Sequence, residues 1–336
     1  MNHSISQRRK RVQSKAFAKK LLQRCSHAVS VAISGHKSPD YDCICSSLAM
    51  QEILRQNGIS ADVLLERPLD DSFYEPIKNC NFVCETDVQY EVVISVDTPE
   101  KNMLPTIANA KRELAQTTFS IDHHHDNSLF MEFSQVWAGE SSACEVTFRT
   151  FEPYFKLNEY LATVFYIGIY ADTGGFIYSN THSTTFDILS KLLKYDIKAD
   201  EIVRDCFMSI SPKSFEMLGR AMASVEFFEN GQIAVSVLRL KDFEETKALY
   251  NDSKLITNYL QRIKDVKVAI CIFEPEKGDY HVSLRTACDN VDVSAIAKKF
   301  NGGGHIRASG MKLVGDYEKA LRALINQTKN VLGLLK

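Results

Sequence analysis

The first half of the chain alternates short apolar runs with amphipathic helical patterns. Strand-like runs are predicted at residues 28–33, 61–65, 92–96 and 117–121, and a helical pattern at 44–54 ends at Asn57-Gly58. This alternation is typical of a parallel sheet, because parallel neighbours need crossover connections that are usually helices. Residues 161–170 are apolar almost all round, which predicts a buried helix. We therefore expect an α/β fold built on a parallel sheet.

The length of the chain favours more than one domain. Its 336 residues exceed the roughly 250–300 at which single hydrophobic cores usually stop growing. Residues 188–223 are helical and charged, and strand-like runs at 233–240, 266–273 and 280–285 then surround helical patterns at 255–263 and 293–300. We predict a basic tail or helix at 1–24, a parallel-sheet, Rossmann-like domain at 25–190, a helical connector at 191–217, and a smaller α/β domain at 218–336.

Composition narrows the classes of function. The net charge of −2 provides no broad basic surface for long nucleic acid, so the basic stretch at residues 8–20 is interpreted as a solvated helix or tail. Nine cysteines without a repeating pattern or signal peptide indicate a reducing cytoplasm, with buried thiols rather than disulfides or a zinc site. No apolar run approaches the ~20 residues that cross a bilayer.

Acidic and imidazole side chains follow four of the predicted buried segments. They are His36, Asp40 and Asp42 after the first strand, Asp97 after residues 92–96, Asp122-His123-His124-His125 after residues 117–121, and Asp172 after the buried helix. In open α/β sheets ligands bind at the carboxyl ends of the strands. Each residue alone is explained by a turn or a cap, but four such segments together indicate a metal site. Mixed carboxylates and imidazoles suit Mn²⁺, with Fe²⁺ or Co²⁺ as alternatives.

The order His36-x-x-Pro39-Asp40-x-Asp42, Asp97, Asp122-His123-His124 and Asp172-Thr173-Gly174-Gly175-Phe176 resembles the DHH phosphoesterase superfamily. The resemblance extends from about residue 28 to residue 310 and implies two divalent metal ions. It assigns one ion to His36 and Asp40, the other to Asp42, His123 and Asp172, and both to Asp97, with His124 beside the attacked phosphate. The chain departs from the family at Cys45, where glycine is common, and we expect this residue to tighten helix packing while leaving every ligand in place.

A glycine-rich segment near the C-terminus predicts a phosphate-binding site. In Asn301-Gly302-Gly303-Gly304-His305 the missing side chains allow backbone N–H groups to approach an anion, and Arg285 can offer its planar fork to phosphate. This combination is similar to the DHH-associated C-terminal domain. The resemblance implies that Arg285, the three glycines and His305 bind substrate, with the active site in the cleft between the two domains.

Within the superfamily, this C-terminal segment and the chain length disfavour type II pyrophosphatases and large RecJ nucleases. The resemblance then implies a nano-RNase/pAp phosphatase. Such an enzyme converts short oligoribonucleotides to 5′-mononucleotides and pAp (3′-phosphoadenosine 5′-phosphate) to AMP, through a hydroxide that two metal ions activate. A soluble phosphodiesterase for cyclic di-AMP or linear pApA is the alternative. The expected partners are short RNA or a small nucleotide, without membrane or long duplex, and a homodimer is left open.

Two non-catalytic functions are less well supported by the sequence than an enzymatic one. A non-catalytic nucleotide sensor on this scaffold would have lost a metal ligand, and none is lost. An RNA-binding factor using the basic N-terminus would need aromatic residues interleaved with the charges, and only Phe17 lies among them.

Overall fold

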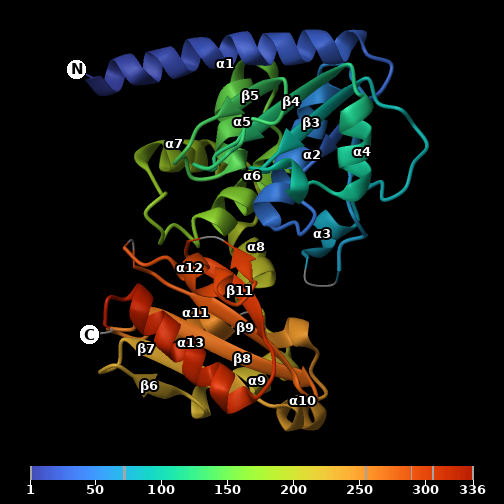
Figure 1. Ribbon diagram of the computed structural model, residues 1–336. Coiled ribbons are helices and arrows are strands. Elements are labelled where there is room, and N and C mark those ends of the chain that lie inside the picture. Colours follow the sequence, from blue (N-terminus) through green and yellow to red (C-terminus); the bar gives the residue numbers. More distant parts are fainter. Residues whose placement is uncertain (1, 71–72, 254–255, 289, 305, 335–336) are drawn as a thin grey trace. The chain divides into compact units, whose positions relative to one another are not determined.

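The computed structural model describes residues 2–70, 73–253, 256–288, 290–304 and 306–334 (Figure 1). The chain divides into two compact units, Met1–Ser209 and Ile210–Lys336, and each contains its own sheet. Within the described ranges, no helix combines the length and hydropathy that a membrane crossing requires.

The first unit is built on a five-stranded sheet in the order β2-β1-β3-β4-β5, and every strand pair in it is parallel. The parallel sheet predicted from the alternating pattern is therefore confirmed. The elements of this unit are α1 (Asn2–His27), β1 (Val31–Ser34), α2 (Tyr41–Gln56), β2 (Asp62–Leu64), α3 (Glu75–Lys78), β3 (Val92–Val96), α4 (Thr106–Leu114), β4 (Thr117–Asp122), β5 (Phe133–Val136), α5 (Ala143–Phe151), α6 (Glu159–Asp172), α7 (Ser183–Leu192) and α8 (Ala199–Val203).

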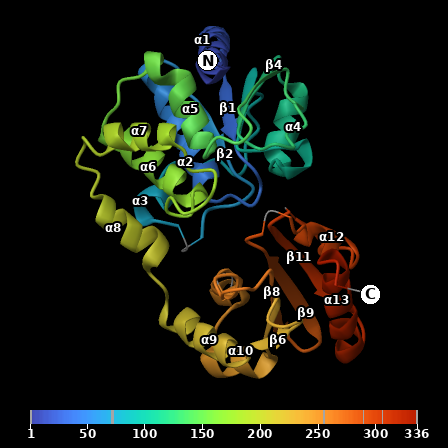
Figure 2. The same ribbon diagram turned by 90° about the vertical axis from the view of Figure 1, so that its left-hand side faces the viewer.

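Helices cover both faces of this sheet, with α4 on one side and α2, α5 and α6 on the other (Figure 2). Side chains of successive strand residues point to opposite faces, so Val31 and Ile33 join the larger core while Ala32 joins the smaller core beside α4. Because both faces are covered, the central strands β1 and β3 are buried along their whole length, which explains their largely hydrophobic sequences.

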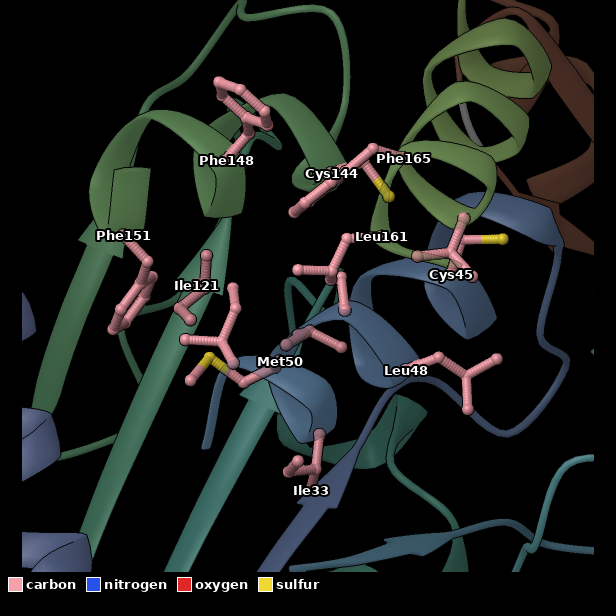
Figure 3. Packing of buried hydrophobic residues seen from close by; sticks show 14 of the residues in the cluster. Ile33, Cys45, Leu48, Met50, Ile121, Cys144, Phe148, Phe151, Leu161 and Phe165 are labelled. Carbon is pink, nitrogen blue, oxygen red and sulfur yellow. The ribbon is translucent and has the colours of Figure 1, made fainter. Parts of the chain in front are cut away.

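The larger core is packed tightly between α2, α5 and α6 (Figure 3). Cys45 is fully buried there in the same hydrophobic cluster as Cys144 and Phe165. Gly168 allows α6 to approach, since a Cβ at this position would lie 2.3 Å from the Cys144 sulfur and 3.1 Å from a carboxylate oxygen of Asp42. The packing of these helices therefore reaches directly to a predicted ligand.

Helix α1 packs along the same core. Ser14, Ala18, Leu21 and Cys25 are buried at intervals of three and four residues, which places them on one face of the helix. The amide of Gln135 on β5 donates a hydrogen bond to the Ser14 hydroxyl at 3.0 Å. The C-terminal half of α1 is thus a packed part of the first unit, with one face in its core.

The second unit contains a six-stranded mixed sheet in the order β10-β11-β9-β8-β7-β6 (Figure 1). Only β7 and β8 pair in parallel. One hydrophobic cluster joins this sheet to α12 and α13, and another joins it to α9, α10 and α11. The elements are α9 (Pro212–Ala223), β6 (Glu226–Phe228), β7 (Ile233–Leu238), α10 (Leu240–Thr246), α11 (Ile256–Leu260), β8 (Val268–Glu276), β9 (Asp279–Arg285), α12 (Val293–Lys298), β10 (Gly303–Gly304), β11 (Ala308–Leu313) and α13 (Tyr317–Val331).

The predicted elements are present, with shifts at their ends that have local causes. The first strand begins at Val31 rather than at residue 28 because α1 continues to His27. Strand β7 ends at Leu238 because the Asp242 carboxylate accepts a hydrogen bond from the Arg239 N–H and α10 begins at Leu240. The strands β5, β6, β10 and β11 and the helices α3, α4, α5, α10 and α13 were not predicted. The division between the units falls at residues 209–210, inside the stretch 191–217.

Replacing Leu21 with Ala should lower the free energy of unfolding of the first unit by about 2–5 kcal/mol, because it leaves a cavity in the core under α1. The only tryptophan, Trp137, lies in this unit and reports its unfolding by fluorescence in a denaturant titration. Arg24→Ala on the exposed face of the same helix is the control and should change stability by no more than about 0.5 kcal/mol. Equal effects of the two variants would contradict the packing of α1.

Candidate metal centre

Asp97 lies at the centre of a cluster of acidic and imidazole side chains. It follows β3 directly, and its backbone is in the left-handed region with φ 47°, an unfavourable conformation for a residue with a Cβ. The residue as a whole is only 3% exposed. Its Oδ1 accepts no hydrogen bond from any described residue, and the nearest imidazole nitrogens, from His123 and His124, are 3.5 and 3.7 Å away. A buried carboxylate oxygen that has imidazole nitrogens nearby but accepts no hydrogen bond fits a bound cation.

One group of ligand atoms beside Asp97 comes from three different elements. His123 Nε2 lies 3.4 Å from Asp172 Oδ2, and with Asp42 these residues form a group whose ligand atoms are all within 4.8 Å of one another. Asp42 comes from α2, His123 follows β4, and Asp172 ends α6. The fold thus gathers three residues that are widely separated in the sequence.

A second group includes Asp97 itself. His36 Nε2 is 3.6 Å from Asp97 Oδ2, and one ligand atom each of His36, Cys43 and Asp97 lie within 4.8 Å of one another. Asp40 belongs to none of the three groups of candidate ligand atoms among the described residues. Its carboxylate caps α2 by accepting the Cys43 N–H at 3.0 Å, and its side chain is exposed at the rim. Asp40 is therefore a predicted ligand that belongs to none of these groups, although its carboxylate interacts electrostatically with Asp97, His36 and His123.

The two histidines after β4 are oriented by different partners. Nδ1 of His123 lies 3.0 Å from the Glu140 carbonyl, and donation to that carbonyl leaves Nε2 for a cation. Nδ1 of His124 lies 2.8 Å from a carboxylate oxygen of the fully buried Asp122. Asp122 also accepts the His123 backbone N–H at 2.8 Å. This carboxylate therefore positions both histidines.

The N-terminus of α5 holds Asp42 in place. The backbone N–H of Ala143 donates to one Asp42 oxygen at 2.6 Å, and that of Cys144 donates to the other at 3.0 Å. The positive end of the helix dipole further favours this buried carboxylate. These contacts were not predicted, although Ser142-x-x-Glu145 has the spacing of a helix-start signal: the Ser142 hydroxyl accepts the Glu145 N–H.

Hydrogen bonds made by the buried Glu145 and by Arg149 connect α5 to neighbouring segments. The Glu145 carboxylate is fully buried and accepts hydrogen bonds from the hydroxyls of Ser141 and Thr185 and from Arg149. Arg149 also donates to the Glu140 side chain at 2.9 Å, the residue whose carbonyl orients His123. The network thus connects the start of α5 with the candidate ligand His123, and sequence reasoning missed all of its members.

A tight turn fixes Asp172 at the end of α6. Gly174 and Gly175 both have positive φ, at 58° and 71°, which glycine adopts without steric cost. The Asn180 amide donates to the backbone carbonyls of Asp172 and Ser141, so the end of α6 is tied to the segment before α5. The glycines of the predicted Asp-Thr-Gly-Gly motif therefore allow the chain to reverse immediately after a candidate ligand.

The charges in the cluster shift its pKa values in a consistent way. Burial alone would raise the pKa of Asp97, but the imidazoles of His123 and His36 outweigh burial and lower it. Burial opposes protonation of His36, yet Cys43 and Asp97 raise the pKa of this imidazole from 6.5 to about 12. Burial, opposed by His123 and reinforced by Asp97, raises the pKa of Asp172 from 3.8 to about 7. The protein groups alone therefore retain protons that a bound cation would displace.

In the second unit, Arg285 ends β9 and donates hydrogen bonds to the Ser283 hydroxyl at 3.2 Å and to the Leu284 carbonyl. The Gly302 N–H donates to the Ala297 carbonyl, and a Cβ at Gly302 would lie 2.4 Å from the Gly310 oxygen. Glycine at position 302 is therefore required by strand packing. Gly303 has open space around its Cα, whereas Gly304, at φ 137°, lies close to Ala308 and Ser309. The predicted substrate residue His305 lies outside the described residues.

Two protein families match this chain. The DHH family N-terminal domain matches residues 30–169, and the DHHA1 domain matches residues 230–332. The probable bifunctional oligoribonuclease and PAP phosphatase NrnA of Streptococcus mutans is 29% identical over 299 residues, covering 87% of this chain and 92% of that protein. The cyclic-di-AMP phosphodiesterase PdeA of Listeria monocytogenes is 23% identical, covering 95% of this chain but 51% of its own length.

A solved structure confirms the fold. The crystal structure of an exopolyphosphatase-related protein from Bacteroides fragilis superposes with a TM-score of 0.87 at 22% sequence identity. The match covers 95% of this chain and 97% of that one.

Metal binding should stabilise the protein more at pH 8 than at pH 6. Between about pH 4 and 7, Asp172 keeps a proton in the folded protein that it has released in the unfolded chain. His36 does the same from about pH 6.5 upward. The contribution of both groups to the stability of the cation-free protein therefore falls as pH rises. Cation binding must displace these protons. A group that holds its proton over the whole range adds about 1.4 kcal/mol of apparent binding free energy per pH unit, and Asp172 adds progressively less above about pH 7.

Thermal unfolding with Mn²⁺ or with a chelator, followed by circular dichroism, measures this difference. Asp97→Asn should remove most of the stabilisation by Mn²⁺ at either pH. A stabilisation that stays constant from pH 6 to pH 8 would contradict the displacement of protons.

Proposed function

This chain is a DHH-family phosphoesterase that carries a DHHA1 domain, and from that premise we propose that it hydrolyses short oligoribonucleotides to 5′-mononucleotides and pAp to AMP with divalent metal ions. The observation that carries this proposal is the gathering of His36, Asp42, Asp97, His123 and Asp172 around an unpartnered, buried carboxylate oxygen. The NrnA relatives support the choice of substrates, since their matches extend over most of both chains.

In this proposal His36 and Asp40 would hold the first ion, Asp42, His123 and Asp172 would hold the second, and Asp97 would contribute to both. The exposed side chain of Asp40 would have to turn toward His36. Mn²⁺ suits this mixture of carboxylate and imidazole, with Co²⁺ and Fe²⁺ as alternatives. A bound pair of such ions supplies positive charge for the phosphoryl oxygens and lowers the pKa of water.

His124 is the residue to which we assign hydrogen bonding or proton donation to the substrate. Burial would lower its pKa, but the carboxylates of Asp122 and Asp97 outweigh burial and raise it. Because Asp122 holds Nδ1, the other ring nitrogen is the one that can face a phosphate. We infer that His124 donates a hydrogen bond or proton to the phosphate or to the leaving oxygen, and that Asp122 positions it.

The DHHA1 domain would supply substrate binding. Arg285 carries a guanidinium that can pair with a phosphate in two places, and Gly303 leaves its backbone open to an anion. The other residues of the proposed phosphate-binding site are Gly302, Gly304 and His305. Gly302 would contribute indirectly, by allowing the close packing of the neighbouring strand. This arrangement suits a substrate of one to a few nucleotides.

Turnover of three substrates by the full-length chain tests the proposal. A short oligoribonucleotide and pAp should be converted to mononucleotides and AMP in the presence of Mn²⁺, at rates well above that for cyclic di-AMP. Asp97→Asn should reduce kcat on every accepted substrate by at least about 10³-fold, because a shared ligand is lost. Arg285→Ala should mainly raise KM.

Preferred hydrolysis of cyclic di-AMP or pApA would favour the alternative activity, which the PdeA relative supports. Full activity of Asp97→Asn would contradict the metal centre itself. An unchanged KM in Arg285→Ala would contradict the role given to the DHHA1 domain.

A further inference from the structure

Cys43 places a thiol among the candidate ligands of the first ion. The residue lies in the first turn of α2, directly after the predicted ligand Asp42. Its sulfur, one imidazole nitrogen of His36 and one carboxylate oxygen of Asp97 all lie within 4.8 Å of one another. The Cys43 side chain is fully buried, whereas those of His36 and Asp97 are 13% and 4% exposed. One cation could therefore reach all three atoms.

The backbone around Cys43 holds the sulfur in this position. The Cys43 N–H donates to the Asp40 side chain, which fixes the start of the helix. Its sulfur lies against the loop that precedes α2, where a Cβ on Gly35 would be 2.1 Å away. Any other residue at position 35 would displace the thiol. The His36 carbonyl oxygen is 3.9 Å from the sulfur. The same short loop therefore carries the His36 imidazole and the backbone atoms that contact the thiol.

The surroundings of Cys43 differ from those of the neighbouring buried cysteines. Cys45 and Cys144 are members of the large hydrophobic cluster of the first unit. Cys43 is equally buried but belongs to none of the hydrophobic clusters in the described part of the chain. A cysteine that only filled space would be expected among apolar side chains. This one faces an imidazole and a carboxylate instead.

We propose that Cys43 is a further ligand of the ion held by His36 and Asp97, and that it biases this position toward thiophilic divalent ions such as Zn²⁺ and Co²⁺ and against Mg²⁺. The inference rests on the metal centre of the proposed function. A cysteine, histidine and carboxylate set is typical of Zn²⁺ and similar ions, while Mg²⁺ prefers oxygen ligands alone. Binding forms a sulfur–metal bond and breaks the S–H bond, and the proton passes to solvent without any change in oxidation state.

The two ion positions would then differ in chemistry. The group made by Asp42, His123 and Asp172 offers one imidazole and two carboxylates. The group made by His36, Cys43 and Asp97 offers one imidazole, one carboxylate and one thiol. The chain could therefore hold a softer ion at one position and a harder ion at the other, and the same protein would respond differently to Zn²⁺ and Mg²⁺.

Titration of the full chain with Co²⁺ alone tests this inference, because a cobalt–thiolate bond produces charge-transfer absorption in the near ultraviolet. Wild type should show this band, and both Cys43→Ala and Cys43→Ser should lack it. Cys45→Ala is the matched control: it removes an equally buried thiol from the same helix and should keep the band. Circular dichroism establishes that each variant is folded, and the serine variant, which preserves the size of the side chain, serves if the alanine variant unfolds.

Competition binding gives a second measurement. Cys43→Ser should lower the affinity for Zn²⁺ by about tenfold or more, and the affinity for Mg²⁺ much less, since only the soft ligand is lost. A wild-type chain without the band, or a Cys43→Ser variant that retains it, would overturn the inference. These measurements need no substrate. A band without nucleotide turnover would therefore refute the proposed function alone, and turnover without a band would refute this inference alone.

Discussion

The first unit is organised around one unfavourable arrangement, a carboxylate buried at the end of a parallel strand without a hydrogen-bond donor for one of its oxygens. Asp97 also has a left-handed backbone, which costs of order 1–3 kcal/mol for a residue with a side chain. Neither feature is stable in isolation. Both are understandable if the surrounding fold is built to present this carboxylate to a cation between His36 and His123.

The rest of the unit keeps the neighbouring groups in position. The amide N–H groups at the start of α5 hold Asp42, the Glu140 carbonyl orients His123, and Asp122 orients His124. The buried Glu145 connects α5 to Thr185 of α7, and Arg149 connects it to Glu140. Since these contacts are made by protein atoms alone, Asp42, His123 and His124 are held in place before a cation binds, whereas Asp40 would have to turn toward the ion.

Much of the fold and site could be predicted from the sequence, because parallel strands buried on both faces are continuously apolar and end in polar turns. That pattern located β3 and β4 and the acids that follow them. The contribution of α5 could not be predicted, since the N–H groups that hold Asp42 carry no side-chain signature and Glu145 meets Thr185 only in the folded chain. Asp40 was predicted as a ligand, but its carboxylate is used as a helix cap at the rim. The role of Cys43 depends on the missing Cβ of Gly35, which spacing alone does not reveal.

The central claim is that Asp97 is shared between two cations, and a crystal structure of the chain grown with Mn²⁺, with anomalous data at the manganese edge, tests it most directly. The account predicts two anomalous peaks about 3.5–4 Å apart, one beside His36 and one beside His123, with Asp97 bonded to both. A single peak away from Asp97, or none in this cluster, would contradict it.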